Sequence, residues 1–262
     1  PKLLEKLGVE CVELFCSPTG NFPHNPEPLP ENLIEISKKV VDTKADLGIV
    51  VDPDVDRLAL VCEDGSMFGE EYTLVSVADY VLSKTPGNTV SNLSSTRALS
   101  DVTNKHNSNY FASAVGEVNV VEKMKDKNAV IGGEGNGGII YPALHYGRDA
   151  LVGIALFLTN LAEKEMSCKS LRKTYPNYFI SKNKIDLDLS VDIAKLLKTL
   201  ESKFSFNNIN TIDGLKINFD DGWVHLRRSN TEPIIRIYSE SVTLDKANQL
   251  AEVFISQIKE LL

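Results

Sequence analysis

The chain has 262 residues, a length that suggests about two structural domains. Hydrophobic residues make up 42% of the chain and charged residues 24%, which is ordinary for a water-soluble globular protein. The net charge of −8 argues against a nucleic-acid partner, and no apolar run approaches the roughly 18 residues that a membrane span requires.

The first 67 residues alternate between short apolar runs and loops. We expect a strand at Val9–Phe15 and, after a loop rich in Pro and Asn, a helix at Glu31–Lys44, because its apolar residues recur at helical spacing. The continuous apolar run Leu47–Val51 predicts a buried parallel strand. Leu58–Cys62 predicts the strand that follows it.

A second α/β unit is expected from residue 68 to residue 178. Its predicted helices are Glu70–Lys84, Thr96–His106, Val118–Lys125 and Asp149–Lys164. Its predicted strands are Thr89–Leu93, Ala129–Ile131 and Ile139–Tyr141, and the last two flank a glycine-rich loop. Together with the first unit, this alternation predicts an α/β fold made of two mixed α/β units.

The remaining residues, 179–262, change to the order β-α-β-β-β-α. The predicted strands are Tyr178–Asp186, Thr211–Phe219, Trp223–Leu226 and Ile234–Tyr238, and the predicted helices are Val191–Phe204 and Leu244–Leu262. That order predicts an α+β domain in which an antiparallel sheet has helices on one face.

An acidic loop follows the predicted strand that ends at Val51. It carries Asp52, Asp54 and Asp56 at alternate positions and then Arg57. Alternate carboxylates in a loop can direct three oxygens to one centre, and Mg²⁺ prefers oxygen ligands in a nearly octahedral arrangement. Three like charges this close repel one another unless a cation offsets them. The loop therefore predicts a magnesium site, with Arg57 placed to hold a phosphate oxygen beside the metal.

The same loop also matches the D-x-D-x-[TV] motif of haloacid-dehalogenase-type phosphatases, in which Asp52 would be a covalent nucleophile. That motif normally lies near the start of its fold, whereas here it begins only at residue 52 and is followed by a third aspartate and an arginine. The residues alone leave a phosphatase open as an alternative function.

A second loop combines basic side chains with hydroxyls. Ser229, Asn230 and Thr231 form a predicted tight turn between two strands, where successive backbone N–H groups can bind an anion. Arg227 and Arg236 lie on the flanking strands and can hold a phosphate group from its sides. An acidic protein that binds a phosphorylated ligand must concentrate positive charge locally, so this loop predicts a phosphate site.

These two loops carry a family resemblance. D-P-D-V-D-R at residues 52–57 resembles the metal loop of the α-D-phosphohexomutases, and R-R-S-N-T-E-P at residues 227–233 resembles their phosphate loop. The family includes phosphoglucomutase, phosphomannomutase and phosphoglucosamine mutase. Residues 22–28 resemble the segment ahead of the metal loop, and residues 132–138 fall where the family has its sugar-recognition loop. The resemblance covers essentially the whole chain.

The resemblance implies a mutase that moves a phosphoryl group between the 1 and 6 positions of a phosphorylated hexose or hexosamine, with Mg²⁺ as cofactor. It further implies that Glu134 and Asn136 contact the sugar and that an Arg-Asp pair, here Arg148-Asp149, supports the sugar loop. The G-E-G-N-G-G loop differs from the G-E-M-S-G-H form of bacterial relatives and resembles an archaeal-like branch. The identity of the sugar, whether glucose, mannose or glucosamine, therefore stays open.

The resembled family has four domains, and the first carries a phosphorylated serine in a loop like T-A-S-H-N-P. No segment of this chain matches that loop, so we expect no catalytic residue here and a phosphoserine upstream. The expected domains are a truncated second domain at 1–67, a third at 68–178 and a fourth at 179–262. Such a chain would need the missing N-terminal domain of the same protein as its partner and would be inactive alone.

Three further expectations follow from single residue types. The four cysteines show no C-x-x-C spacing, which indicates free thiols in a reducing compartment and a cytoplasmic location. His225 alternates with Trp223 and Arg227 on a predicted strand, which favours a surface position over a role as a base. A non-catalytic protein that binds a sugar phosphate is the remaining alternative function.

Overall fold

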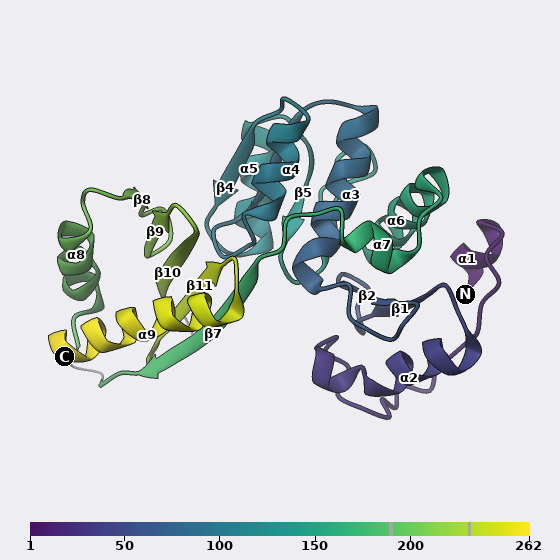
Figure 1. Cartoon of the computed structure of the whole chain (residues 1–262), viewed down its shortest axis with the longest axis horizontal. Coiled ribbons are helices and arrows are strands. Elements are labelled where there is room, and N and C mark those ends of the chain that lie inside the picture. The colour runs from purple at the N-terminus through teal and green to yellow at the C-terminus, as the bar shows by residue number, and fades with distance from the viewer. Residues whose placement is uncertain (189–190, 230–231) are drawn as a thin grey trace. The chain divides into compact units, whose positions relative to one another are not determined.

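The computed structural model describes residues 1–188, 191–229 and 232–262. These residues form two compact units, and each draws on separate stretches of the chain (Figure 1). The first unit comprises Pro1–Ser91, Ala98–Phe111 and Gly116–Pro176, and the second comprises Asn92–Arg97, Ala112–Val115 and Asn177–Leu262. The three predicted domains stay a prediction, because a division into two units does not test their boundaries.

The first unit begins with a part built on one hairpin. Its elements are α1 (Lys2–Lys6), a short 3₁₀ helix (Pro30–Asn32), α2 (Ile34–Thr43), β1 (Leu47–Val51) and β2 (Leu58–Cys62). Strand β1 pairs antiparallel with β2, so the parallel pairing expected for this apolar run is wrong. The strand expected at Val9–Phe15 does not form, because these residues are exposed or half-buried and find no strand partner in the described part of the chain.

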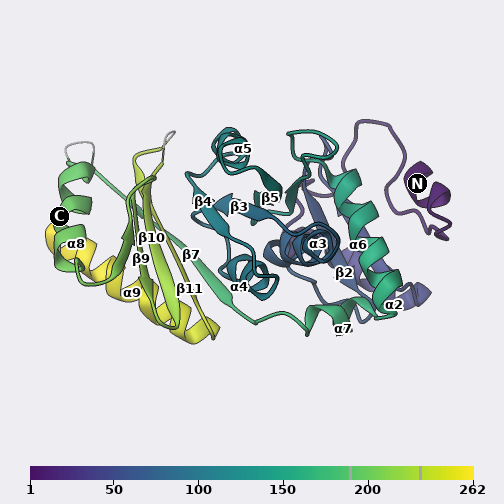
Figure 2. The ribbon, with the colours of Figure 1, turned by 90° about the horizontal axis from the view of Figure 1, so that it is seen from above.

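The larger part of the first unit is a layered α/β structure. Its helices are α3 (Glu70–Lys84), α4 (Ala98–Lys105), α5 (Glu117–Asp126), α6 (Ala150–Lys164) and α7 (Cys168–Arg172). Its strands are β3 (Asn88–Asn92), β4 (Tyr110–Ser113), β5 (Ala129–Glu134) and β6 (Gly138–Ile140), in the sheet order β4-β3-β5-β6, and the last residues of β3 and β4 are counted with the second unit. Strands β3 and β5 are parallel, whereas β6 returns antiparallel to β5. Helix α5 lies on one face of the sheet and α3 and α4 on the other (Figure 2).

The second unit is a five-stranded antiparallel sheet in the order β7-β11-β10-β9-β8. Its elements are β7 (Phe179–Asp186), α8 (Ile193–Lys203), β8 (Asn208–Asn210), β9 (Leu215–Phe219), β10 (Gly222–Arg228), β11 (Ile234–Ser241) and α9 (Leu244–Leu261). Alternate residues of the strands, such as Val224 and Leu226, pack with Leu200 of α8 and Phe254 of α9. Both helices therefore cover one face, and the predicted fold class is confirmed.

The sequence pattern missed two short strands. The segment expected to be one strand, Thr211–Phe219, contains only β9, and β8 precedes it as a separate strand. Strand β4 was not expected either, because three of its four residues are only half-buried and show little apolar patterning.

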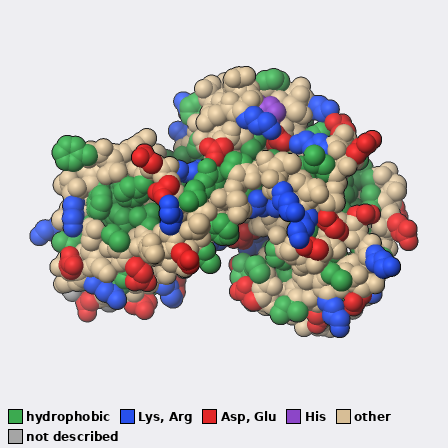
Figure 3. All heavy atoms as spheres, in the orientation of Figure 1, with side chains coloured by type: hydrophobic (Ala, Val, Ile, Leu, Met, Phe, Trp, Pro, Cys, Tyr) green, Lys and Arg blue, Asp and Glu red, His purple; other side chains and the backbone are tan. Residues whose placement is uncertain are grey.

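The described residues include neither a membrane-spanning helix nor a disulfide bond. Among the described residues, no helix is both long and apolar enough to cross a membrane. The four cysteines form no disulfide, as their spacing indicates. On the face drawn in Figure 3, acidic and basic side chains are interspersed, which is the pattern of an ordinary solvated surface.

Candidate functional site

The acidic loop connects β1 to β2 and is organised by Asp52, which is only 3% exposed. Its Oδ1 atom accepts the backbone N–H groups of Asp56 and Arg57, each at 3.0 Å, and its Oδ2 atom accepts Arg57 Nε at 2.7 Å. The Asp52 carbonyl accepts the Val55 N–H at 3.1 Å, and Val55 takes a left-handed φ of 60°. These bonds fix the curvature of the loop.

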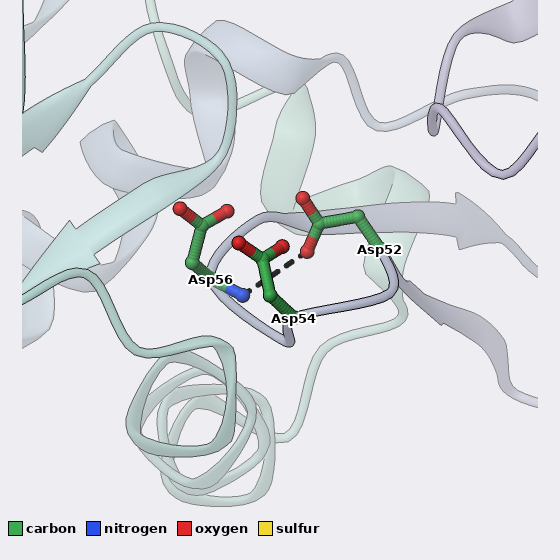
Figure 4. A group of neighbouring side chains, drawn as sticks. All are labelled: Asp52, Asp54 and Asp56. Carbon is green, nitrogen blue, oxygen red and sulfur yellow. Dashed lines mark hydrogen bonds between the residues drawn. The ribbon is translucent and has the colours of Figure 1, made fainter.

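The carboxylates of Asp52, Asp54 and Asp56 gather on one side of this loop (Figure 4), and one oxygen from each lies within 4.8 Å of the others. Burial, a hydrogen bond with Asp52 and the charges of Asp52 and Asp54 raise the pKa of Asp56 to about 6, although the Arg148 guanidinium opposes this. Burial also opposes ionisation of Asp52, but hydrogen bonds from Arg57 outweigh it and lower the pKa of Asp52. Crowded carboxylate oxygens of this kind suit a hard divalent cation such as Mg²⁺.

Arg57 donates hydrogen bonds to two carboxylates, and its Nε atom lies 3.7 Å from a third, that of Asp56. Besides Asp52, its guanidinium donates a hydrogen bond to Glu27 Oε1 at 3.3 Å. Glu27 belongs to residues 22–28, the segment that resembles the one ahead of the family's metal loop. The guanidinium therefore lies beside the carboxylate cluster, and its contact with phosphate stays a prediction.

The glycine-rich loop lies beside the acidic loop. It connects β5 to β6, and its Gly137 carbonyl accepts the N–H of Leu58, the residue where β2 begins, at 3.1 Å. Gly137 has a φ of +85°, which glycine adopts without strain. The Asn136 amide oxygen accepts the Gly138 N–H at 3.1 Å, so this predicted sugar-binding side chain also shapes the turn.

Arg148 joins the two loops. Its terminal nitrogens bind Glu134 Oε2, at 3.0 Å, and Asp56 Oδ2. Its Nε atom lies 3.3 Å from Glu117 Oε2, and Glu117 Oε1 accepts the Arg148 backbone N–H at 3.0 Å. Glu134 is 6% exposed, and its other oxygen accepts the Gly116 N–H at 3.2 Å. The structure thus brings the predicted metal and sugar residues together in the first unit.

The start of helix α6 places Arg148 at this junction. Asp149 is the N-cap, and its Oδ1 atom accepts the N–H groups of Leu151 and Val152 at 2.8 and 3.0 Å. The N–H of Ala150 donates to the carbonyl of Val55 in the acidic loop at 3.0 Å. The family resemblance pointed to Arg148, whereas no sequence signal indicated its contact with the metal loop or the part played by Glu117.

The predicted phosphate residues lie in the second unit, on the hairpin of β10 and β11. Arg227 and Arg236 are direct cross-strand partners, an arrangement of like charges that an anion would stabilise. Ser229 is 5% exposed, and its N–H donates to the Ile234 carbonyl at 3.1 Å. Two of the predicted residues lie outside the described part of the chain: Asn230 and Thr231.

The surface position predicted for His225 is wrong, because this residue is 1% exposed. Its Nε2 atom lies 2.6 Å from the Asp213 carbonyl and its Nδ1 atom 2.9 Å from Ser94 Oγ. A carbonyl only accepts, so Nε2 carries the proton and Nδ1 accepts the Ser94 hydroxyl. Burial lowers the pKa of His225 to about 4, and the charges of Lys216 and Arg227 act in the same direction.

The buried neutral imidazole predicts that acid destabilises the protein. The unfolded chain protonates His225 near pH 6.5, whereas the folded chain does so only near pH 4, so proton uptake favours unfolding within this interval. We expect His225 to account for about 2 kcal/mol of the unfolding free energy lost between pH 7 and pH 5. Urea unfolding at both pH values measures this loss, and an equal loss in His225→Gln would contradict it.

Three family models match successive parts of the chain. The model described as phosphoglucomutase/phosphomannomutase, alpha/beta/alpha domain II, matches residues 1–65. Alpha/beta/alpha domain III of the same family matches residues 69–178, and the C-terminal domain matches residues 182–257.

Similar whole proteins carry the corresponding names. A phosphoglucomutase/phosphomannomutase of Thermococcus kodakarensis is 35% identical over 266 residues, which cover 100% of this chain and 58% of that protein. A phosphoglucosamine/phosphogalactosamine mutase of Sulfurisphaera tokodaii is 32% identical over 90% of this chain and 52% of its own length. The crystal structure of a phosphoglucomutase/phosphomannomutase family protein from Burkholderia thailandensis matches with a TM-score of 0.86 and 29% identity, over 99% of this chain and 57% of its own. This chain therefore spans little more than half the length of these proteins.

Proposed function

Because this chain belongs to the phosphoglucomutase/phosphomannomutase family, we propose that it supplies the metal, sugar and phosphate sites of a mutase. The mutase interconverts the 1-phosphate and 6-phosphate of a hexose or hexosamine through a phosphoserine and a bisphosphate intermediate. The phosphoserine belongs to a part of the enzyme outside these 262 residues. A soluble sugar phosphate as substrate favours a cytoplasmic location.

The acidic loop is the proposed metal site, held by Asp52, Asp54 and Asp56. Bound Mg²⁺ supplies positive charge that offsets the charge of phosphoryl oxygens. Asp52 keeps the loop in shape through its hydrogen bonds, whereas Asp54 is exposed and available to a ligand. Arg57 contacts a phosphate oxygen beside the carboxylates in this proposal.

The sugar and the second phosphate bind the other two loops. Glu134 accepts hydrogen bonds from sugar hydroxyls, with Asn136 beside it, and Arg148 keeps the Glu134 carboxylate in place. Because the bisphosphate must bind in two orientations, Glu134 has to accept hydrogen bonds from the sugar hydroxyls in both. The phosphate that is not being transferred is bound by the predicted phosphate residues of the second unit: Arg227, Ser229, Asn230, Thr231 and Arg236.

The observation that carries this proposal is the attachment of the glycine-rich loop to the acidic loop. The Leu58–Gly137 hydrogen bond and the Arg148 bridge hold Asp56 and Glu134 at a fixed separation within one unit. Phosphoryl transfer depends mainly on holding the substrate in the right position relative to neutralising charge. An acidic turn that served only to solvate the surface would need no such attachment.

The two alternatives fit less well. In a phosphatase, an oxygen of Asp52 would have to form a covalent bond to phosphorus, but Asp52 is 3% exposed and both its oxygens accept hydrogen bonds from the loop. A cation needs only a remaining lone pair on one of these oxygens and leaves the hydrogen bonds in place. A beryllofluoride adduct on Asp52 would favour that alternative. If the protein only binds sugar phosphates, the full-length protein should not convert glucose, mannose or glucosamine phosphates. A comparison of the conversion rates of these three substrates therefore tests this alternative and also identifies the sugar.

Magnesium binding to this chain tests the metal site directly. We expect Asp54→Asn to weaken Mg²⁺ binding at least about tenfold, because one of three charged ligands is lost. Isothermal titration measures this, and Asp46→Asn, an exposed aspartate just before β1, is the charge-matched control. Equal Mg²⁺ affinity in both variants would count against the proposed site.

A further inference from the structure

We propose that Asp213 is a positioning residue for Arg227. This inference rests on the proposed function, since it concerns how the side chain assigned to the phosphate is held. Asp213 lies in the turn between β8 and β9, and its Oδ2 atom is 3.8 Å from a terminal nitrogen of Arg227. The two side chains are 23% and 20% exposed, so water screens this ion pair only in part.

Asp213 is fixed at both its side chain and its backbone. Its Oδ2 atom accepts the Val115 N–H at 2.9 Å, and its carbonyl accepts Nε2–H of the buried His225 at 2.6 Å. His225 is itself fixed by the Ser94 hydroxyl at 2.9 Å. Gly214 follows with a φ of +75°, and a Cβ there would lie 2.2 Å from a backbone carbonyl of β10. The carboxylate therefore has little freedom to move.

Arg227 needs such an anchor for two physical reasons. Its cross-strand partner is Arg236, and repulsion between the two guanidinium groups favours conformations that point away from the loop. A long arginine side chain also loses up to about 2 kcal/mol of rotamer entropy when it is ordered. A fixed carboxylate on one side of Arg227 offsets the repulsion and orders the side chain before the phosphate arrives.

The test is a double-variant cycle on this chain, with inorganic phosphate as the probe in isothermal titration at low salt. We expect Arg227→Gln to weaken phosphate binding about tenfold or more and Asp213→Asn to weaken it about three- to fivefold. The double variant should bind like Arg227→Gln alone, because Asp213 acts through Arg227. Asp220→Asn, in the turn between β9 and β10, is the charge-matched control and should bind like the unaltered chain.

Two results would overturn the inference while leaving the proposed phosphate site intact. These are unchanged or tighter binding in Asp213→Asn, or a double variant that binds more weakly than Arg227→Gln. Unchanged binding in Arg227→Gln would instead overturn the proposed phosphate site itself. If Asp213→Asn does not fold, Asp213→Glu takes its place, because it keeps the charge; it is expected to bind phosphate within about threefold of the unaltered chain. A larger loss of affinity in a folded Asp213→Glu contradicts the inference, provided that Arg227→Gln also weakens phosphate binding.

Discussion

Replacement of Arg148 by alanine is expected to lower the free energy of unfolding by about 3 kcal/mol at neutral pH. The Arg148 side chain is 19% exposed, and those of its partners Asp56 and Glu134 are 17% and 8% exposed. The variant leaves these carboxylates and that of Glu117 close together without their shared cation. Removing one member of a buried pair costs about 3 to 5 kcal/mol, and partial solvent access places this case at the lower end.

Urea unfolding of two further variants shows whether the loss comes from this particular arrangement. Lys169→Ala removes a pair with Asp64 in which both side chains are more than a third exposed, so its cost should be much smaller than that of Arg148→Ala. Arg148→Lys keeps the charge but loses the planar guanidinium that reaches several carboxylates. Its loss of unfolding free energy should therefore lie between those of Arg148→Ala and Lys169→Ala. A cost for Arg148→Ala as small as that for Lys169→Ala would contradict the bridging role.

Magnesium should partly reverse the loss in Arg148→Ala. A cation bound by the aspartates restores positive charge beside Asp56, so Mg²⁺ should raise the melting temperature of the variant more than that of the unaltered chain. Equal shifts in both proteins would mean that Arg148 and the metal act on separate charges. This readout needs no catalytic activity, so it applies to the 262-residue chain itself.

The parts of the site that the sequence predicted are those with a local signal. Three aspartates at alternate positions after a strand lie close together in any tight loop, and the structure places their oxygens within 4.8 Å. The family resemblance, which rested on such local motifs, is confirmed by the three matching family models. The phosphate loop stays partly untested because Asn230 and Thr231 lie outside the described residues.

The parts that the sequence did not predict depend on contacts between distant segments. His225 has the alternation of a surface position, but it is buried, and its ring contacts both the Asp213 carbonyl and Ser94, the latter 131 residues away in sequence. Arg148 likewise meets Asp56 across 92 residues. In the same way, Val9–Phe15 has the composition of a strand, but none of the described strands pairs with it. Periodicity predicts which face of an element is apolar, but not which polar segment covers the other face.

Gly137→Ala is expected to have the largest effect on the site, with a loss of about 4 kcal/mol in unfolding free energy. A Cβ at Gly137 would lie 2.2 Å from the Leu58 carbonyl oxygen and 3.0 Å from the Leu58 nitrogen. Both contacts are to backbone at the buried start of β2, which cannot turn aside as a flexible side chain would. The glycine-rich loop must then move away from β2, with loss of the Leu58–Gly137 hydrogen bond.

Gly20→Ala separates this steric effect from the cost of the left-handed backbone. Gly20 has a φ of +77°, close to that of Gly137, but a Cβ there meets no atom of the described residues within 4 Å. Its cost should therefore be about 1 kcal/mol, the usual penalty for a non-glycine residue in this conformation. Urea unfolding compares the two variants, and equal losses would mean that backbone conformation alone accounts for the effect. A larger loss in Gly137→Ala, accompanied by weaker Mg²⁺ binding in any fraction that stays folded, would show that the glycine-rich loop and the acidic loop hold each other in position.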